Sequence, residues 1–432
     1  MIKTYLKQAW TMLRQHKLFS SIYIAGTGLS IALIMTLFII FYVKIAPIYP
    51  EYNRANTAVV GYIDINNNHS GYIGYYWVKH EFPKLKHAKA IGTKIGRLVN
   101  VEASVQTDNI SAKVPCMPVD GGFWKIFTFD FIKGNAFTQE DVLARRRMAV
   151  ISESLAKRLF ASTDIVGKSI LLNGNKFSIS GVVRDVSAAT PDTYSEVWIP
   201  LEQQGVDTYT NANSFRGNNR VYMLTDNPDS LSMEFEAFVH RFNNSQSDFK
   251  ITFNHTNRTI PQWETGLSNI ITDNESAPLK DIIVILLALL IIPALNLSGM
   301  LSSRMDSRRS EIGVRKAYGA TNGKLVSQVL WENLLLTGIG GLVGLILSYI
   351  AVITSSNWIM TLFGTNEYSW YIYSGERIET SLSTEMLFNP YIFVGALSLC
   401  LILNVISALI PTLWALRTPI IQSINAKRYP PQ

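Results

Sequence analysis

The chain has 432 residues, and only 16% of them are charged, against roughly 25% in soluble domains, which indicates long uncharged blocks. The net charge is +7, but the basic residues are not pooled into one patch, which argues against a nucleic-acid-binding protein. The two cysteines, Cys116 and Cys400, cannot form a disulfide framework, and we expect no bridge between them.

Residues 1–21 combine an apolar stripe with scattered positive charge. The lysines and the arginine lie mostly off the stripe, whose apolar residues recur at helical spacing: Ile2, Leu6, Ala9, Trp10 and Leu13. This pattern predicts an amphipathic helix lying in the cytoplasmic interface of a membrane. The alternative is a plain basic flank that only sets the orientation of the segment after it.

Four runs are long and apolar enough to cross a bilayer, since about 20 apolar residues span its roughly 30 Å hydrocarbon core. Residues 22–43 and 282–303 carry no charge, a third apolar run follows Glu332, and the fourth lies close to the end of the sequence. A buried core helix suits runs of about 10 to 14 residues and not these. We predict four transmembrane helices, of which the first is an uncleaved anchor and not a signal peptide.

Lysine and arginine residues near the spans set the orientation. Thirteen basic and two acidic residues lie in 1–21, 304–324 and 415–432, a net charge of +11, whereas the rest of the chain carries −4. Both termini and the loop between the second and third spans are therefore predicted to be cytoplasmic, and the large segment 44–281 is predicted to lie outside.

The extracytoplasmic segment mixes strand-like and helical runs. Runs rich in β-branched and aromatic residues predict strands at 58–65, 148–152, 176–183, 195–201 and 220–225. Residues 152–160 predict a short helix capped by Ser152 or Ser154, and Asn173-Gly174 predicts a hairpin turn. The polar stretch 206–219 predicts a surface loop.

The expected fold class is an α-helical membrane protein with four transmembrane helices and an α+β extracytoplasmic domain between spans one and two. In chain order we predict a cytoplasmic helix (1–21), a first span (22–43), the extracytoplasmic domain (44–281), a second span (282–303), a cytoplasmic coupling segment (304–325), a third span (326–354), an extracytoplasmic loop (355–388), a fourth span (389–414) and a cytoplasmic tail (415–432).

The sequence predicts no catalytic or metal site. Gly167-Lys168-Ser169 is similar to the end of a phosphate-binding loop, but that pattern needs glycine where the chain has Ser162, and the segment is predicted to lie outside the cell. His80-Glu81 begins a metalloprotease-like pattern that fails at Lys84, and the six histidines lack ligand spacing. We expect no enzyme activity and no cofactor in this chain.

Small residues in the spans predict close helix packing. Gly340 and Gly344 form a G-x-x-x-G pair in the third span, and Gly26 and Gly28 lie in the first. In lipid, such residues let helices approach closely. Packing within one chain and packing between two copies both fit this pattern.

The segment between the second and third spans combines charge, a short helix and a glycine break. Glu311 and Arg315 can pair at i,i+4, Arg315 and Lys316 are expected to face the cytoplasm, and Gly319 is expected to end the helix before a second helix enters the third span. Such a helix can transmit force from a cytoplasmic partner; the alternative is an ordinary positive-inside loop. The candidate coupling residues are Glu311, Ile312, Gly313, Val314, Arg315, Lys316, Ala317, Gly319 and Ala320.

Four segments, in this order, resemble the MacB/FtsX-like ABC transporter permeases. They are LKQAWTMLRQHKLFSSIYIAGTGLSIA, VISESLAKRLFASTDIVGKSILLNGNKFSISGVVRDV, the second span with EIGVRKAYGAT, and LIPTLWALRTPIIQSI. The resemblance covers nearly the whole chain, accounts for Gly167-Lys168-Ser169 without a nucleotide, and does not specify an individual member.

This resemblance implies a MacB-type periplasmic core domain, with an inserted part near 121–200, in a bacterial inner-membrane protein. It also implies a dimer, either of two copies or with a related permease. Because only residues 1–21 precede the first span, the ATPase that uses ATP and Mg is expected to be a separate cytoplasmic chain. A periplasmic adaptor and an outer-membrane channel are further partners that the resemblance allows.

The expected function is mechanotransmission, in which ATP hydrolysis by the partner moves the periplasmic domain and drives efflux of a substrate from the periplasm. Lipoprotein release and control of a cell-wall hydrolase are alternatives within the family. A membrane receptor or scaffold and a membrane-anchored outer enzyme are alternatives from other classes. The sequence does not specify the substrate.

Overall fold

The computed structural model divides into two compact units. The helical unit includes residues 17–42 and 309–354, and the sheet unit includes residues 43–268. The structure describes residues 17–66, 69–96, 99–105, 108–201, 215–246, 248–254, 256–268, 284, 309–354, 394–395, 397–399, 401–402 and 405–406.

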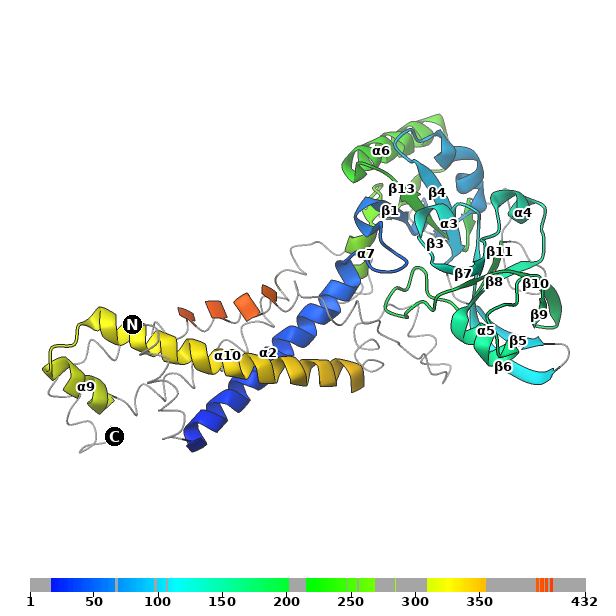
Figure 1. Cartoon of the computed structure of the whole chain (residues 1–432). Coiled ribbons are helices and arrows are strands. Elements are labelled where there is room, and N and C mark those ends of the chain that lie inside the picture. The colour runs from blue at the N-terminus through cyan, green and yellow to red at the C-terminus, as the bar shows by residue number, and fades with distance from the viewer. Residues whose placement is uncertain are drawn as a thin grey trace. The chain divides into compact units, whose positions relative to one another are not determined.

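The helical unit contains long apolar helices. Helix α2 spans Lys17–Ile45 and α10 spans Asn322–Thr354, with the short helix α9, Arg309–Ala317, ahead of α10 (Figure 1). Within the described residues, α2 and α10 each hold a stretch long and apolar enough to cross a membrane, Ile24–Ile45 and Thr337–Thr354. The helices therefore fit the predicted first and third spans.

The predicted boundaries of these spans differ from those of the helices. Residues 17–21 belong to α2, and α10 begins before residue 326, because the backbone of each helix continues past the apolar run. The predicted spans 282–303 and 389–414 lie mostly outside the described residues, and the loop 355–388 and the tail 415–432 lie wholly outside them. The count of four spans stays a prediction.

The sheet unit is α+β, as predicted. Its helices are η1 (Arg54–Asn56), η2 (Trp77–Glu81), η3 (Phe82–Lys84), α3 (Phe123–Ile126), α4 (Gln139–Leu143), α5 (Glu153–Phe160), α6 (Pro228–Ser245) and α7 (Gln262–Ser268). Its strands are β1 (Thr57–Val60), β2 (Tyr62–Ile65), β3 (His69–Ile73), β4 (Ala90–Ile95), β5 (Val99–Val105), β6 (Asp108–Val119), β7 (Phe131–Gly134), β8 (Met148–Ser152), β9 (Ser169–Leu172), β10 (Asn175–Val183), β11 (Val197–Pro200), β12 (Arg216–Gly217), β13 (Asn219–Leu224), β14 (Ile251–Phe253) and β15 (Ile260–Pro261).

Hydrogen bonds join these strands into one mixed sheet. Its main order is β11-β8-β10-β9-β5-β6-β4-β13-β3-β2-β14, and β1, β7, β12 and β15 attach to its members. Most pairs are antiparallel, but β8 with β10 and β6 with β11 are parallel. After β1 to β4, the chain forms β5 to β11. It then returns to the first strands, where β12 pairs with β3 and β13 pairs with β1 and β4.

Several local predictions are confirmed. Asn173 and Gly174 adopt φ of +48° and +76° and join the antiparallel strands β9 and β10, as an Asn-Gly hairpin turn requires. The hydroxyl of Ser152, one of the two predicted caps, accepts from the N–H of Leu155 at 3.2 Å. All five predicted strand regions contain strands.

The predicted loop 206–219 is wrong at its end, and residues 206–214 lie outside the described part. Phe215 packs against Trp77 with ring centroids 5.2 Å apart, and its carbonyl accepts from the Trp77 indole at 2.8 Å. Residues 216–217 pair with β3, and Asn219 is buried at the start of β13. The aromatic side chain of Phe215 thus holds a polar segment against the core.

The sheet unit has two hydrophobic cores of different composition. The first is rich in aromatic rings and includes Trp77, Phe82, Phe123, Trp198, Phe235 and Phe253. The second is almost wholly aliphatic, between β5, β8, β10 and the face of α5, and includes Val101, Leu155, Leu159, Ile170 and Ile179. The aliphatic core also takes in Val101, Ala103 and Val114, which precede residue 121, and the inserted part near 121–200 stays a prediction.

Candidate coupling site

The end of helix α9 is fixed by the backbone around Gly319, which has φ of +84°. The Ala320 N–H donates to the Arg315 carbonyl at 3.1 Å, and the Gly319 N–H donates to the Lys316 carbonyl at 2.9 Å. This pair of bonds is a Schellman motif, which satisfies carbonyls that the helix itself leaves open. The predicted helix end is confirmed, and α10 begins soon afterwards at Asn322.

Two charged residues of α9, Arg315 and Lys316, have described side chains. Arg315 is half-buried, and its Nη1 donates to Gln328 Oε1 on α10 at 2.5 Å, so this side chain holds the two helices together. Lys316 is also half-buried and Gly313 is buried. That Arg315 and Lys316 face the cytoplasm stays a prediction. The side chains of Glu311 and Ile312 lie outside the described part, so their predicted roles stay predictions.

Among the described side chains of α9 and its turn, residues 313–320, the exposed ones are mainly apolar. Val314 is 44% exposed and Tyr318 is 89% exposed, four residues apart and therefore on one helical face. Ala317 and Gly319 are exposed beside them, and Ala320 is half-buried. Tyr318 was not among the predicted site residues, although an aromatic residue next to a helix-ending glycine is a readable signal.

The glycines of the first and third predicted spans meet within one chain, where α2 and α10 cross (Figure 1). A Cβ atom on Gly344 would lie 2.7 Å from the Gly28 carbonyl oxygen, and one on Gly340 would lie 3.0 Å from the Thr27 side chain. A Cβ on Gly28 would lie 3.3 Å from the Gly340 carbonyl oxygen. Only hydrogen at these positions permits such close backbones. Gly26 is half-buried.

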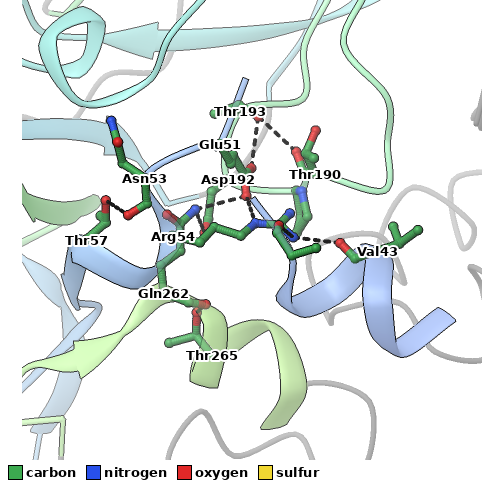
Figure 2. Close-up of polar contacts among 12 residues, drawn as sticks. Val43, Glu51, Asn53, Arg54, Thr57, Thr190, Asp192, Thr193, Gln262 and Thr265 are labelled. Atoms are coloured by element: carbon green, nitrogen blue, oxygen red, sulfur yellow. Dashed lines mark hydrogen bonds and ion pairs between the residues drawn. The ribbon is translucent and has the colours of Figure 1, made fainter. Parts of the chain in front are cut away.

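A second candidate site is a group of buried polar side chains in the sheet unit, named here the polar cluster (Figure 2): Glu51, Arg54, Asp192, Thr193 and Gln262. Arg54 Nη1 donates to the carbonyl oxygens of Val43 at 2.6 Å and Ala46 at 3.0 Å, at the end of α2. The last carbonyls of a helix have no partner inside it and attract cations. Arg54 therefore fixes the final turn of α2 to the segment that leads into β1.

Glu51 joins three segments of the chain. Its carboxylate accepts from Arg54 Nε at 2.8 Å, from Thr193 Oγ1 at 2.9 Å and from Gln262 Nε2 at 2.9 Å. The side chains of Glu51 and Arg54 are 1% and 3% exposed. A buried ion pair is tolerated only when further hydrogen bonds satisfy its remaining atoms, and Thr193 and Gln262 supply them.

Asp192 extends the polar cluster into the sheet. Gln262 Nε2 also donates to Asp192 Oδ2 at 3.0 Å, so one amide nitrogen bridges two carboxylates. The Tyr222 hydroxyl donates to Asp192 Oδ1 at 2.6 Å, and the same oxygen lies 3.5 Å from Arg220 Nε and 3.8 Å from Lys94 Nζ. The loop that carries Asp192 is thereby tied to strands β4 and β13.

The two carboxylates of the polar cluster have different electrostatic surroundings. Burial raises the pKa of Glu51, and the Arg54 guanidinium opposes that shift. Burial acts in the same sense on Asp192, but Arg220 and Lys94 outweigh it and hold the pKa of Asp192 below its usual range. Asp192 is therefore the fixed negative charge to which the neighbouring groups are oriented.

The segment Gly167-Lys168-Ser169 is a structural turn. The Gly167 N–H donates to the Ile179 carbonyl at 2.8 Å, and the Lys168 N–H donates to the Ile165 carbonyl at 3.0 Å. A phosphate-binding loop needs such N–H groups to face a ligand, but here one is bonded to strand β10 and the other within the turn. Within the described ranges, no group of three His, Cys, Asp or Glu side chains could hold a metal ion.

Two families match the chain. Residues 20–236 match the family described as MacB-like periplasmic core domain, and residues 282–420 match the one described as FtsX-like permease C-terminal. The two matches follow one another along the chain, and together they take in most of the sheet unit and the α9–α10 turn.

Several curated proteins are similar to the chain. The uncharacterized ABC transporter permease YknZ of Bacillus subtilis is 25% identical over 232 residues, 54% of this chain and 55% of the relative. The pyoverdine export ATP-binding/permease protein PvdT of Pseudomonas savastanoi is 24% identical over 57% of this chain and 36% of its own length. The macrolide export ATP-binding/permease protein MacB of Neisseria gonorrhoeae is 25% identical over 50% of this chain and 32% of its own. The chain thus spans about half the length of the first relative and about a third of the other two.

Two solved structures resemble part of the chain. The extracellular domain of YknZ covers 46% of this chain with 100% of its own length, at 17% identity and a TM-score of 0.33. The periplasmic region of MacB from Actinobacillus actinomycetemcomitans covers 46% of this chain with 90% of its own length, at 16% identity and a TM-score of 0.34.

Proposed function

The chain belongs to the MacB/FtsX-like permease family of ABC transporters, and on that basis we propose that it is a membrane subunit driven by a separate cytoplasmic ATPase. That partner would use ATP and Mg, and this chain would carry no catalytic site. Its task would be to convert ATP-driven movement of the helical unit into movement of the sheet unit. Two of its relatives are named as export proteins, which supports efflux as the direction of transport.

The exposed turn after α9 is the observation that carries this proposal. Val314, Ala317 and Tyr318 present apolar surface, while the Schellman motif and the bond from Arg315 to Gln328 hold the turn rigid. A rigid apolar turn transmits the movement of a bound partner better than a flexible charged loop, because a preorganised segment does not change shape when it is pushed. Residues 311–320 would dock into a groove on the ATPase, with Tyr318 as an added contact residue.

The remaining assignments rest on the charge pattern and the family. Four spans with both termini and 304–325 in the cytoplasm would place the sheet unit in the periplasm of a bacterial inner-membrane protein. A second copy or a related permease would complete a dimer. A periplasmic adaptor and an outer-membrane channel would complete an efflux path.

The test is purification of the tagged full chain from its host in mild detergent, followed by an ATP hydrolysis assay. We expect vanadate-sensitive hydrolysis in the complex and none after the partner is stripped away. Lys168→Ala should leave the rate unchanged, because Lys168 lies in a structural turn. ATP turnover by the stripped chain that disappears in Lys168→Ala would contradict the proposal.

A further inference from the structure

The polar cluster joins segments near the two ends of the described part of the sheet unit. Helix α2, which holds the first predicted span, ends at Ile45, and Arg54 binds the carbonyls of its last turn. Gln262 is the first residue of α7, on the segment that precedes the predicted span 282–303. Glu51 accepts hydrogen bonds from both Arg54 and Gln262, so one carboxylate connects the two segments (Figure 2).

The third segment in the polar cluster is a buried loop. Residues 186–195 have no regular secondary structure yet are buried throughout, whereas connecting loops normally lie on the surface. Thr193 donates to Glu51, and Asp192 accepts from Gln262 and Tyr222. The loop leads directly into β11, which pairs with β8 and β6 and contributes Val197 and Ile199 to the aliphatic core.

Buried charge is a costly way to stabilise a fold, because well-packed apolar residues of similar volume are often as stable or more so. Hydrogen bonds and ion pairs add a fixed geometry, because they form only at particular distances and angles. An apolar contact allows segments to slide past one another, whereas bonds from one carboxylate to three segments fix their relative positions. The bonds of the polar cluster connect the end of α2, the start of α7 and the loop before β11, and not three neighbouring positions of one element.

We propose that Glu51, Arg54, Thr193 and Gln262 are positioning residues of a mechanical joint. Movement of α2 is passed through Arg54 to Glu51. From Glu51 it reaches α7 through Gln262. It also reaches the aliphatic-core part of the sheet unit through Thr193 and Asp192. This inference rests on the proposed function, since it requires ATP-driven movement of the helices.

The test measures movement inside the sheet unit of the full complex with its ATPase, in lipid nanodiscs. Spin labels on Lys176→Cys and Met233→Cys report the distance between β10 and α6, and both native side chains are exposed. Cys400→Ala removes one native thiol, and Cys116 is buried with a raised pKa, so it stays unlabelled. The distance distribution is compared between the nucleotide-free and the vanadate-trapped complex.

The informative variants remove one bond while keeping side-chain volume. Gln262→Met breaks the amide link between Glu51 and Asp192, and Thr193→Val removes the hydroxyl that Thr193→Ser keeps. The matched control is Asn243→Leu, because the Asn243 amide makes two bonds to Ile251 that stay between α6 and β14. We expect the vanadate-dependent shift to be lost in Gln262→Met and Thr193→Val and kept in Thr193→Ser and Asn243→Leu. ATP hydrolysis should remain within twofold of the unsubstituted protein in all four.

Four results would overturn the joint. A normal shift in Gln262→Met and Thr193→Val, or loss of folding in both, would show that the polar cluster only stabilises the domain. A complex that hydrolyses ATP without any shift would leave no movement to transmit, and the proposed ATPase coupling would stand. A complex that hydrolyses no ATP would remove the proposed function and the joint with it.

Discussion

The turn between α9 and α10 and the polar cluster both fix helices in place, but they are built in opposite ways. The turn uses backbone bonds between residues close in sequence and leaves Val314 and Tyr318 exposed. The polar cluster is one buried hydrogen-bond network between residues far apart in the sequence, among them Glu51, Asp192 and Gln262. An exposed, locally built element suits reversible contact with another protein, whereas a buried network suits a connection that must not come apart.

This difference predicts that substitutions in the two regions affect different quantities. A change at the exposed turn should leave the free energy of unfolding within about 0.5 kcal/mol, since surface changes away from special features seldom exceed that. A change that leaves a charge unpaired in the polar cluster should lower stability strongly before any effect on coupling is seen.

The largest effect is expected for Arg54→Met, which leaves the Glu51 carboxylate buried without its cation. Removing one partner of a buried pair costs about 3–5 kcal/mol, whereas the double variant Glu51→Leu/Arg54→Met should cost clearly less, because no lone charge remains. Denaturant unfolding of the full chain in detergent, followed by tryptophan fluorescence, measures both. Equal losses in the single and the double variant would mean that the ion pair contributes nothing specific.

An intermediate loss of stability is expected at the crossing of α2 and α10, where Gly340 and Gly344 lie against Gly28. In Gly344→Ala the new Cβ would lie 2.7 Å from the Gly28 carbonyl oxygen and 2.9 Å from Ile31, so the helices must shift. Overpacking of this kind costs typically about 1–3 kcal/mol.

The matched control is Gly338→Ala on the same helix, where a Cβ meets nothing within 4 Å. This change should be neutral or stabilising by up to about 1 kcal/mol through helix propensity. Thermal unfolding in detergent compares the two variants. If they behave alike, the close contact within the chain is not what these glycines provide.

The smallest effect on stability is expected from Asp120, a buried carboxyl. The backbone N–H groups of Thr93 and Phe123 donate to it, whereas Asp192 has cations beside it. Burial raises the pKa of Asp120 to about 7. Because the folded-state pKa lies above the unfolded value, this group favours folding at low pH, and that contribution is lost as pH rises through about 7.

Acidification from pH 7.5 to 6 should therefore stabilise the protein by roughly 1 kcal/mol through Asp120. Asp120→Asn keeps the side-chain oxygen acceptor and should lose this part of the pH dependence. The unfolding free energies of the two proteins across this range give the contribution by difference. An unchanged pH slope in Asp120→Asn would assign the titration to other groups.

The features that depend on residues adjacent in sequence could be predicted from the sequence. The Asn173-Gly174 turn, the Ser152 cap and the helix end at Gly319 each follow from a backbone requirement written in a few adjacent residues. The long apolar helices follow from length and composition. The family resemblance extended these local signals to residues 20–236 and 282–420.

The polar cluster could not be predicted in the same way. Glu51 and Arg54 stand three residues apart after an apolar run, which gives a weak hint, but nothing nearby indicates that Thr193 and Gln262 donate to Glu51. The bond from Arg315 to Gln328 could not be predicted either, because it depends on how α9 and α10 meet. Contacts between distant segments are set by tertiary packing, which sequence patterns do not encode locally.

The central claim is that the exposed turn after α9 receives movement from an ATPase. The most direct measurement is vanadate-sensitive ATP hydrolysis by the purified complex carrying Val314→Asp with Tyr318→Asp, compared with Lys324→Asp on the exposed start of α10. The account predicts at least about tenfold loss of stimulated hydrolysis in the double variant, equivalent to about 1.4 kcal/mol of docking energy, with normal abundance and stability and little change in Lys324→Asp. Full stimulation in the Val314→Asp/Tyr318→Asp complex would contradict it.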